Sequence, residues 1–361
     1  MQNLINDTHA KRNYDFVDTI RCIAMILIVA DHCFYFEPED FHPKGLAELL
    51  YNSTIEFSKL GTVSFFLLSG FLIGEKFTEY TPLQYLKRRF NNTIWPWLVW
   101  SLLYIFIYNF HLITDTFVLF KPGTSGAGTI YSLLDFAKIT YLYSIYWFIP
   151  NFLFCIVLLL VFKKYLYSYV LGAALLCCTL LYSANIYFLW IIPNHTTAIF
   201  GFVFFLWLGA QLNKNWGQVN KWLGRTPTPV WCLLAIITFG MSLFEIGLLK
   251  SRHSTEPFNT LSLSNVLCSL ACFFLLVKMG DFKLIKKLKP RETTYGVYLI
   301  HYILVSTLLL DIFWPYHIQL DSLSPLMVLA YQLTRFLIVY GITIGLVMLI
   351  NKTKFKWVIG R

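Results

Sequence analysis

The stretch "IRCIAMILIVADHC", Ile20–Cys33, is an apolar run with an arginine near one end and an aspartate–histidine pair near the other. It lies inside a longer run, Val17–Phe36, which has the length that an α-helix needs to cross a bilayer. Ionisable groups inside a membrane are costly and mark function when they occur there. The stretch therefore predicts a membrane helix that carries part of a functional site.

The composition of the whole chain extends this prediction. Of the 361 residues, 57% are hydrophobic and 13% charged, with a mean hydropathy of +0.60, whereas soluble domains have roughly 45–50% apolar and 25% charged residues. The net charge of +10 does not indicate a nucleic-acid partner, because the lysines and arginines lie between apolar runs. We expect an all-α, polytopic integral membrane protein surrounded by lipid.

Ten apolar runs have about the length of a transmembrane helix. The connecting segments are too short for a separate soluble domain, the longest being Thr114–Leu142. We therefore expect a single transmembrane domain over residues 1–361, with a polar N-terminal tail 1–15, no cleavable signal peptide and no extracytoplasmic catalytic domain. The ten runs are Val17–Phe36, Ile55–Ile73, Ile94–Ile113, Tyr143–Phe162, Tyr165–Ala184, Thr197–Leu212, Val230–Leu249, Leu261–Val277, Thr294–Phe313 and Leu326–Ile350.

Basic residues alternate between the segments that separate these runs. One set of segments holds 21 Lys and Arg, at 11–12, 76–89, 163–164, 214–225, 278–291 and 352–361, whereas the other set holds five, Lys44, Lys121, Lys138, Lys250 and Arg252. Basic loops stay on the cytoplasmic side. The pattern predicts that both termini are cytoplasmic. As a separate expectation, the protein is a multi-pass protein of the cytoplasmic (inner) membrane of a bacterium.

Arg21 and His32 lie on one face of the first predicted helix. They are eleven residues apart, which gives an angular offset of about 20° and an axial separation of roughly 16 Å. Arg21 alone could extend to the lipid headgroups, and His32 alone could bond to a backbone carbonyl at the interface. Asp18 and Asp31 beside them make a functional cluster the better interpretation, although Asp31 points about 100° away from His32.

Several other polar groups have less specific interpretations. Glu56 and Lys59, one turn apart, are expected to pair, and Arg335 needs either a partner such as Glu245 or a water-filled cavity. The Gly-rich stretch Lys121–Thr129 lacks the ending of a phosphate-binding loop, so we expect a flexible outer loop. The histidines expected in solvated outer loops are His42, His111, His195, His253 and His317, with lining of an acceptor site as the alternative. The eight cysteines expected to be small buried hydrophobic residues are Cys22, Cys33, Cys155, Cys177, Cys178, Cys232, Cys268 and Cys272.

Five sequence elements, in order along the chain, resemble the motifs of the membrane acyltransferase-3 family. The first contains an Asp three residues before an Arg and a His eleven residues after that Arg; the last is a Tyr-Leu-x-His element in a late span. The elements are "YDFVDTIRCIAMILIVADH" (Tyr14–His32), "FFLLSGFLIG" (Phe65–Gly74), "YLKRRFNNTIWPWLVW" (Tyr85–Trp100), "YWFIPNFLF" (Tyr146–Phe154) and "YGVYLIHYIL" (Tyr295–Leu304).

The resemblance implies transfer of an acyl group, most simply acetyl, from cytoplasmic acetyl-CoA to a hydroxyl of a cell-envelope glycan or a lipid-linked sugar. His32 would be the catalytic base, and Arg21 would contact the donor phosphates or orient the donor. Arg88 and Arg89 would add phosphate contacts, although such residues are often only topology determinants. We expect no metal, and a homodimer is one alternative for the open oligomeric state.

Four further residues would line the donor cavity on this interpretation. Ser69 precedes Gly70 in a small pair that is more typical of helix packing. Trp147 could belong equally to an interfacial aromatic belt. His301 and Tyr298 lie one turn apart, and a structural interhelix hydrogen bond is the alternative for His301.

Two other functional classes remain open from the sequence. A transporter or flippase of lipid-linked sugars would use the intramembrane ions as a substrate pathway, but it does not account for the ordered motifs. A membrane scaffold without chemistry does not account for the presence of both Arg21 and His32.

Overall fold

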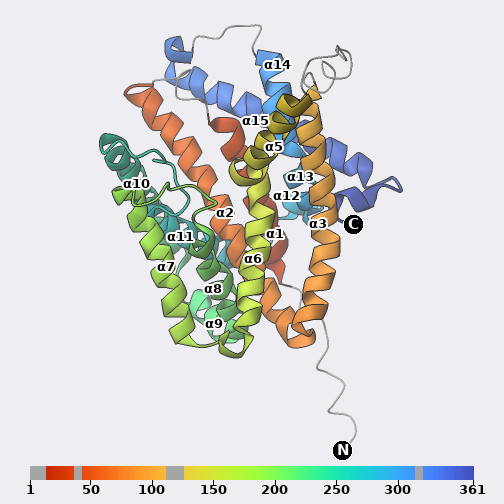
Figure 1. Ribbon diagram of the computed structural model, residues 1–361. Helices are drawn as coiled ribbons and strands as arrows, with labels where there is room; N and C mark the ends of the chain where they lie inside the picture. Colours follow the sequence, from red (N-terminus) through yellow and green to blue (C-terminus); the bar gives the residue numbers. More distant parts are fainter. Residues whose placement is uncertain (1–13, 36–42, 111–125, 314–319) are drawn as a thin grey trace, which may run out of the picture.

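The computed structural model describes residues 14–35, 43–110, 126–313 and 320–361, which form helices and connecting loops (Figure 1). The long helices are α1 (Asp15–Phe34), α2 (Leu46–Glu79), α3 (Pro82–Tyr108), α5 (Gly126–Tyr143), α6 (Phe148–Val161), α7 (Tyr169–Phe188), α8 (Val203–Lys214), α10 (Thr228–Ser251), α11 (Leu263–Met279), α13 (Pro290–Ile303) and α15 (Pro325–Ile350). Shorter helical elements are η1 (Ile145–Trp147), η2 (Lys163–Tyr165), η3 (Ile199–Gly201), α9 (Trp216–Arg225), α12 (Lys283–Lys286), η4 (Leu304–Leu308), α14 (Leu309–Phe313), η6 (Leu320–Ser322) and η7 (Lys356–Ile359).

Within the described residues, each of the ten predicted runs coincides with a helix or a nearly continuous helical segment; Phe36 and residues 111–113, at the ends of two runs, lie outside them. In the described part of the chain, four helices are individually long and apolar enough to cross a membrane, or five if the bent pair α5–α6 counts as one span. Helices such as α1 carry Asp15, Asp18, Arg21 and Asp31, which lower their hydropathy, while α8 and α11 are short. The protein is thus an integral multi-pass membrane protein, and the number ten stays a prediction.

The segment Thr114–Leu142 is not simply a connecting loop. Residues 126–143 form α5, so the last four residues of the Gly-rich stretch begin a helix, and the prediction of a flexible loop is wrong for them. Residues 121–125 lie outside the described residues. The apolar run that follows the glycines outweighs their low helix propensity of about 1 kcal/mol per residue. Helix α5 meets α6 at an angle of 67°, and Ser144 at the bend accepts a hydrogen bond from the Tyr146 amide.

Helix α2 runs obliquely through the molecule and packs against α1 and α8 (Figure 1). The contact with α8 depends on two glycines: a Cβ atom at Gly70 would lie 2.0 Å from the Leu206 carbonyl oxygen, and one at Gly209 would lie 2.1 Å from the Leu67 oxygen. This close approach is typical of small residues between membrane helices. Gly70 therefore acts in packing.

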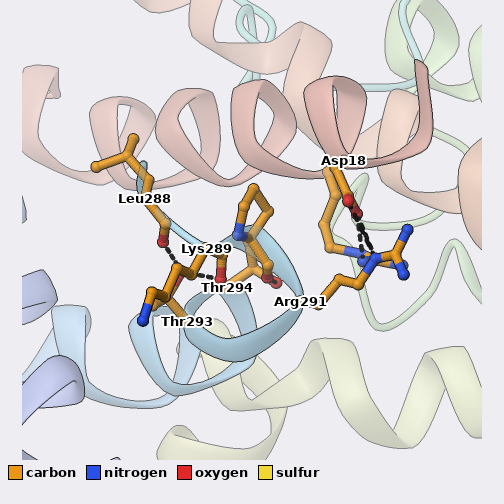
Figure 2. A network of polar contacts seen from close by, with 8 residues as sticks. Asp18, Leu288, Lys289, Arg291, Thr293 and Thr294 are labelled. Atoms are coloured by element: carbon orange, nitrogen blue, oxygen red, sulfur yellow. Dashed lines mark hydrogen bonds and ion pairs between the residues drawn. The ribbon is translucent and has the colours of Figure 1, made fainter. Parts of the chain in front are cut away.

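The helices that complete the site begin with clear local signals. Thr81 caps α3 and forms a capping box with Gln84, and Pro82 occupies the first position. Helix α13 begins with Pro290 after Lys289, whose φ of 48° is left-handed. The Thr293 hydroxyl then donates to the carbonyl oxygens of Leu288 and Lys289 (Figure 2). These bonds stabilise the first turn of α13.

The predicted Glu56–Lys59 pair is wrong, and Glu245, one of the alternatives for Arg335, has other partners. Lys59 pairs with Asp31 of α1 at 2.9 Å rather than with Glu56, because α1 packs directly against α2. Glu245 accepts from the Tyr187 hydroxyl and from the amides of Leu263 and Ser264 at the start of α11. Its acceptor capacity is therefore used there, whereas the Arg335 guanidinium lies over the ring of Tyr331 at 5.7 Å.

The prediction of buried cysteines holds for half of them. Cys22, Cys33, Cys155 and Cys268 are buried, Cys178 and Cys272 are partly buried, and Cys177 and Cys232 are exposed. The two exposed thiols lie on α7 and α10, which are candidate membrane spans. The apolar composition around them reflects a lipid-facing surface rather than a protein core.

Candidate functional site

A single cavity of about 280 Å³ connects Arg21 with His32 along α1. Its walls come from α1, α2, α3, η1, α6, α13 and the loops that hold His195 and Thr260. Its polar lining residues are Arg21, Asp31, His32, Thr62, Ser69, Arg89, Asn92, Thr93, His195, Thr260, Arg291, Thr294, Tyr295 and Tyr298. The eleven-residue spacing on α1 thus runs along a real cavity.

Three arginines gather at one end of this cavity. Arg21 of α1 bonds to Asp18 at 3.1 Å, and the Nε atom of Arg291 lies 3.0 Å from each oxygen of the same carboxylate. Figure 2 shows Arg291 reaching from the start of α13 to Asp18 on α1. Arg89 of α3 is the third cation of this end. One carboxylate thus holds two guanidinium groups in place and leaves the end with excess positive charge.

The neighbouring Arg88 and Arg89 have different surroundings. Arg89 is half-buried, lines the cavity and donates from Nε to the Tyr85 hydroxyl at 2.9 Å. Arg88 is exposed, bonds to the Tyr80 hydroxyl at 2.9 Å and is not among the cavity-lining residues. Successive helical residues point about 100° apart, so only one of the pair can face the cavity.

At the other end, His32 lies among polar groups from several elements. The Asp31–Lys59 ion pair is beside it, with each side chain 15% exposed. His195 stacks on Trp147, with ring centres 4.7 Å apart and an interplanar angle of 9°. His195 is therefore not a solvated loop histidine, contrary to the sequence prediction, because the loop between α7 and η3 folds onto the cavity. His253 is exposed as expected, and His42, His111 and His317 lie outside the described residues.

Burial and the nearby Lys59 ammonium lower the pKa of His195 from 6.5 to about 4. Its loop lies between two helices rather than within a membrane-spanning segment. The ring is therefore neutral at physiological pH and presents a hydrogen-bonding nitrogen rather than a charge.

His301 of α13 lies behind His32 rather than among the cavity-lining residues. The two rings have centres 5.5 Å apart. His301 is fully buried, and its Nδ1 atom lies 3.0 Å from the Val297 oxygen and 2.8 Å from the Tyr298 oxygen. His301, which the sequence predicted to line the donor cavity, thus lies beside His32 and not at the end where the three arginines gather.

Trp147 and Tyr298 form part of the cavity wall and are held by backbone contacts. The Tyr298 hydroxyl donates to the Ile145 carbonyl at 2.7 Å, and the neighbouring Tyr146 hydroxyl donates to the Leu299 carbonyl at 3.2 Å. These bonds attach η1 to α13. Trp147 is thus a wall residue of the cavity, and the Tyr298 hydroxyl already has a backbone acceptor.

The structure brings together Arg21, His32, Ser69, Arg89, Trp147 and Tyr298 around one cavity. It also places Arg291 and Asn92 there, which the sequence did not assign to the site, together with Asp31 and His195, whose roles the sequence left open. Asn92 lies within the quoted third-span element, and Arg291 lies in a basic segment that indicated only topology. The arrangement can hold a long polyanionic ligand by its charged end and present its other end to His32.

Comparison with known proteins adds one positive result. A family model described as an acyltransferase domain matches residues 14–352. No curated protein and no solved structure matches the chain significantly. The resemblance seen in the motifs is therefore confirmed over most of the chain, which belongs to the acyltransferase-3 family of membrane acyltransferases.

Proposed function

We propose that the protein transfers an acetyl group from cytoplasmic acetyl-CoA to a hydroxyl of a cell-envelope glycan or a lipid-linked sugar. The observation that carries the proposal is the cavity itself, which has three arginines at one end and His32 at the other. A coenzyme A thioester has phosphates at one end and the reactive carbonyl at the other. The polarity of the cavity corresponds to that of the donor.

The donor phosphates bind to Arg21, Arg89 and Arg291. Guanidinium groups form charge-assisted, bidentate hydrogen bonds to phosphate, and Asp18 keeps Arg21 and Arg291 side by side. The thin pantetheine arm then lies between α1 and α2, past Ser69 and Trp147. The acetyl group reaches His32, roughly 16 Å along α1 from Arg21.

In the reaction, the acceptor hydroxyl oxygen attacks the thioester carbonyl carbon, and His32 accepts the hydroxyl proton. The carbon–sulfur bond then breaks, the departing sulfur takes up the proton from His32, and the acetyl ester and free coenzyme A are the products. The enzyme is unchanged and no net proton is released. His32 combines a titratable nitrogen with a position on the cavity at this point, on the same helix face as Arg21.

The acceptor enters from the side of Asp31, Lys59 and His195. The proposed topology has ten spans in a single membrane domain, with both termini in the cytoplasm of a bacterial cell, because the basic segments alternate with apolar runs. Arg21, Arg89 and Arg291 then lie toward the cytoplasm, where acetyl-CoA is available. His32 lies toward the outer side, where the glycan is located.

The test is release of free coenzyme A thiol by purified protein in detergent, with acetyl-CoA and candidate sugar acceptors. We expect His32→Ala to lower turnover by about 100-fold or more, the usual contribution of a general base. His253→Ala is the matched control, because that histidine is exposed and outside the cavity lining. Sugar movement across vesicles without thiol release, or full turnover of His32→Ala, would overturn the proposal in favour of a transporter or another base.

A further inference from the structure

His301 has a fixed hydrogen-bonding state. Its Nδ1 atom contacts two backbone carbonyl oxygens, of Val297 and Tyr298. A carbonyl oxygen can only accept, so Nδ1 must carry the hydrogen. In the neutral ring Nε2 then has a lone pair and acts as an acceptor.

The Nε2 acceptor lacks a hydrogen-bond partner among the described residues, although His301 is completely buried. Buried polar atoms are nearly always hydrogen-bonded, and an exception needs a reason. The ring centre of His32 is 5.5 Å away. Because a ring nitrogen lies roughly 1.2 Å from its ring centre, facing nitrogens of the two rings would be about 3 Å apart, a hydrogen-bond length. In the structure the two rings do not form this bond, and a reorientation of His32 is needed to make it.

The backbone next to His301 is unusual as well. Helix α13 ends at Ile303 and continues as a π-helical turn, Leu304–Leu308. Such turns are rare and are frequent at functional sites. The hydroxyls of Ser306 and Thr307 donate to the carbonyls of Tyr302 and Ile303, at 2.9 Å and 2.6 Å, which satisfies backbone groups of the wide turn. Tyr302 at this junction contacts the His32 ring edge-on, with centres 5.7 Å apart.

We propose that His301 is a positioning residue that sets the tautomer of His32. In this role a turn of the His32 ring brings its N–H to the His301 Nε2 lone pair, so that the other nitrogen of His32 faces the cavity without a hydrogen and accepts the proton of the acceptor hydroxyl. This is the role that a carboxylate has beside the histidine of a catalytic triad. The inference rests on the proposed function and deepens it.

Two substitutions separate this role from simple helix anchoring. His301→Gln places an amide oxygen near the position of Nε2 and keeps an acceptor there, whereas His301→Asn keeps a donor near Nδ1 and removes that acceptor. We expect the kcat of thiol release to be about 100-fold lower for His301→Asn and at least tenfold higher for His301→Gln than for His301→Asn. The KM for acetyl-CoA should stay unchanged in both, because His301 does not line the cavity.

A ratio of kcat values near one, or a higher kcat for His301→Asn, would overturn the inference, because then the Nδ1 bonds or simple packing matter instead. A second measurement uses the His32→Ala background, in which His301→Asn should cause no further loss if it acts through His32. An additional loss there equal to the loss in wild type would contradict the role. Both results are distinct from failure of the proposed function, which would appear as absence of thiol release by the wild-type protein.

Discussion

Replacing Lys59 should lower the free energy of unfolding far more than replacing Lys250, which pairs with Glu48. The Nζ atom of Lys59 lies 2.9 Å from Asp31 Oδ2, and both side chains are 15% exposed. With an effective dielectric constant of 20, the attraction at this distance is about 6 kcal/mol, and breaking a buried pair on one side costs about 3–5 kcal/mol net. We therefore expect Lys59→Met to lower the free energy of unfolding by about 3–5 kcal/mol.

The assay is thermal unfolding in detergent, followed with a thiol-reactive dye. Cys22, Cys33, Cys155 and Cys268 are buried and become reactive on unfolding, whereas Cys177 and Cys232 are exposed and define the starting signal. With an unfolding entropy of about 2.1 cal/mol/K per residue, the expected loss lowers Tm by about 4–7 °C.

Lys250→Met is the matched control. Lys250 pairs with Glu48 at 3.1 Å, but the two side chains are 33% and 40% exposed, and exposed pairs contribute about 0–1 kcal/mol. The double substitution Asp31→Asn with Lys59→Met should recover most of the lost stability, because Asp31 is then no longer an unpaired charge. If Lys59→Met shifts Tm no more than Lys250→Met, or if the two substitutions at the pair are additive, the buried-pair reasoning is refuted.

Two further predictions concern the ends of the cavity. Arg291→Gln should raise the KM for acetyl-CoA about 10–100-fold with little change in kcat, because a hydrogen bond to a charged group contributes about 1.5–3 kcal/mol. Arg225 is an exposed arginine at the end of α9, so Arg225→Gln should leave this KM unchanged. Equal effects of the two substitutions would show that Arg291 does not bind the donor. At the other end, the lowered pKa of His195, about 4, means that the unfolded chain binds a proton before the folded one as pH falls. The free energy of unfolding should therefore decrease as the pH falls from 6.5 to 4. His195→Gln should make the accompanying decrease in Tm less steep, whereas His253→Gln should not. An unchanged slope of Tm against pH in His195→Gln would show that another group causes the decrease.

The sequence was sufficient to predict the helical class and the central feature of the site. Arg21 and His32 lie on one helix, so helix periodicity alone places them on one face, and their eleven-residue spacing sets the axial separation. The positions of the membrane helices can likewise be predicted from local sequence, because a segment in lipid must satisfy its own backbone hydrogen bonds by forming a helix. These predictions need no knowledge of how the helices pack.

The remaining features depend on packing between segments far apart in the sequence. Arg291 reaches Asp18 across 273 positions, and Lys59 chooses Asp31 over Glu56 because α1 lies against the relevant face of α2. The spacing of Glu56 and Lys59 permits a pair but cannot show which competitor is nearer. His195 is similar, because its loop carries no periodic signal, and only the folded chain brings it to Trp147.

The charge distribution along the cavity bears on which substrate enters at which end. At the Arg21 end, Asp18 pairs with Arg21 and Arg291, and Arg89 adds a third guanidinium group, so an anionic ligand meets unneutralised positive charge. At the His32 end, the charges of Lys59 and Asp31 neutralise each other at 2.9 Å, and His195 is neutral at physiological pH. In the proposed function, a polyphosphate donor is therefore attracted to one end only, while the other end favours an uncharged hydroxyl-bearing group. The ion pair with Asp31 thus also keeps the Lys59 ammonium from binding the donor phosphates near the proposed base.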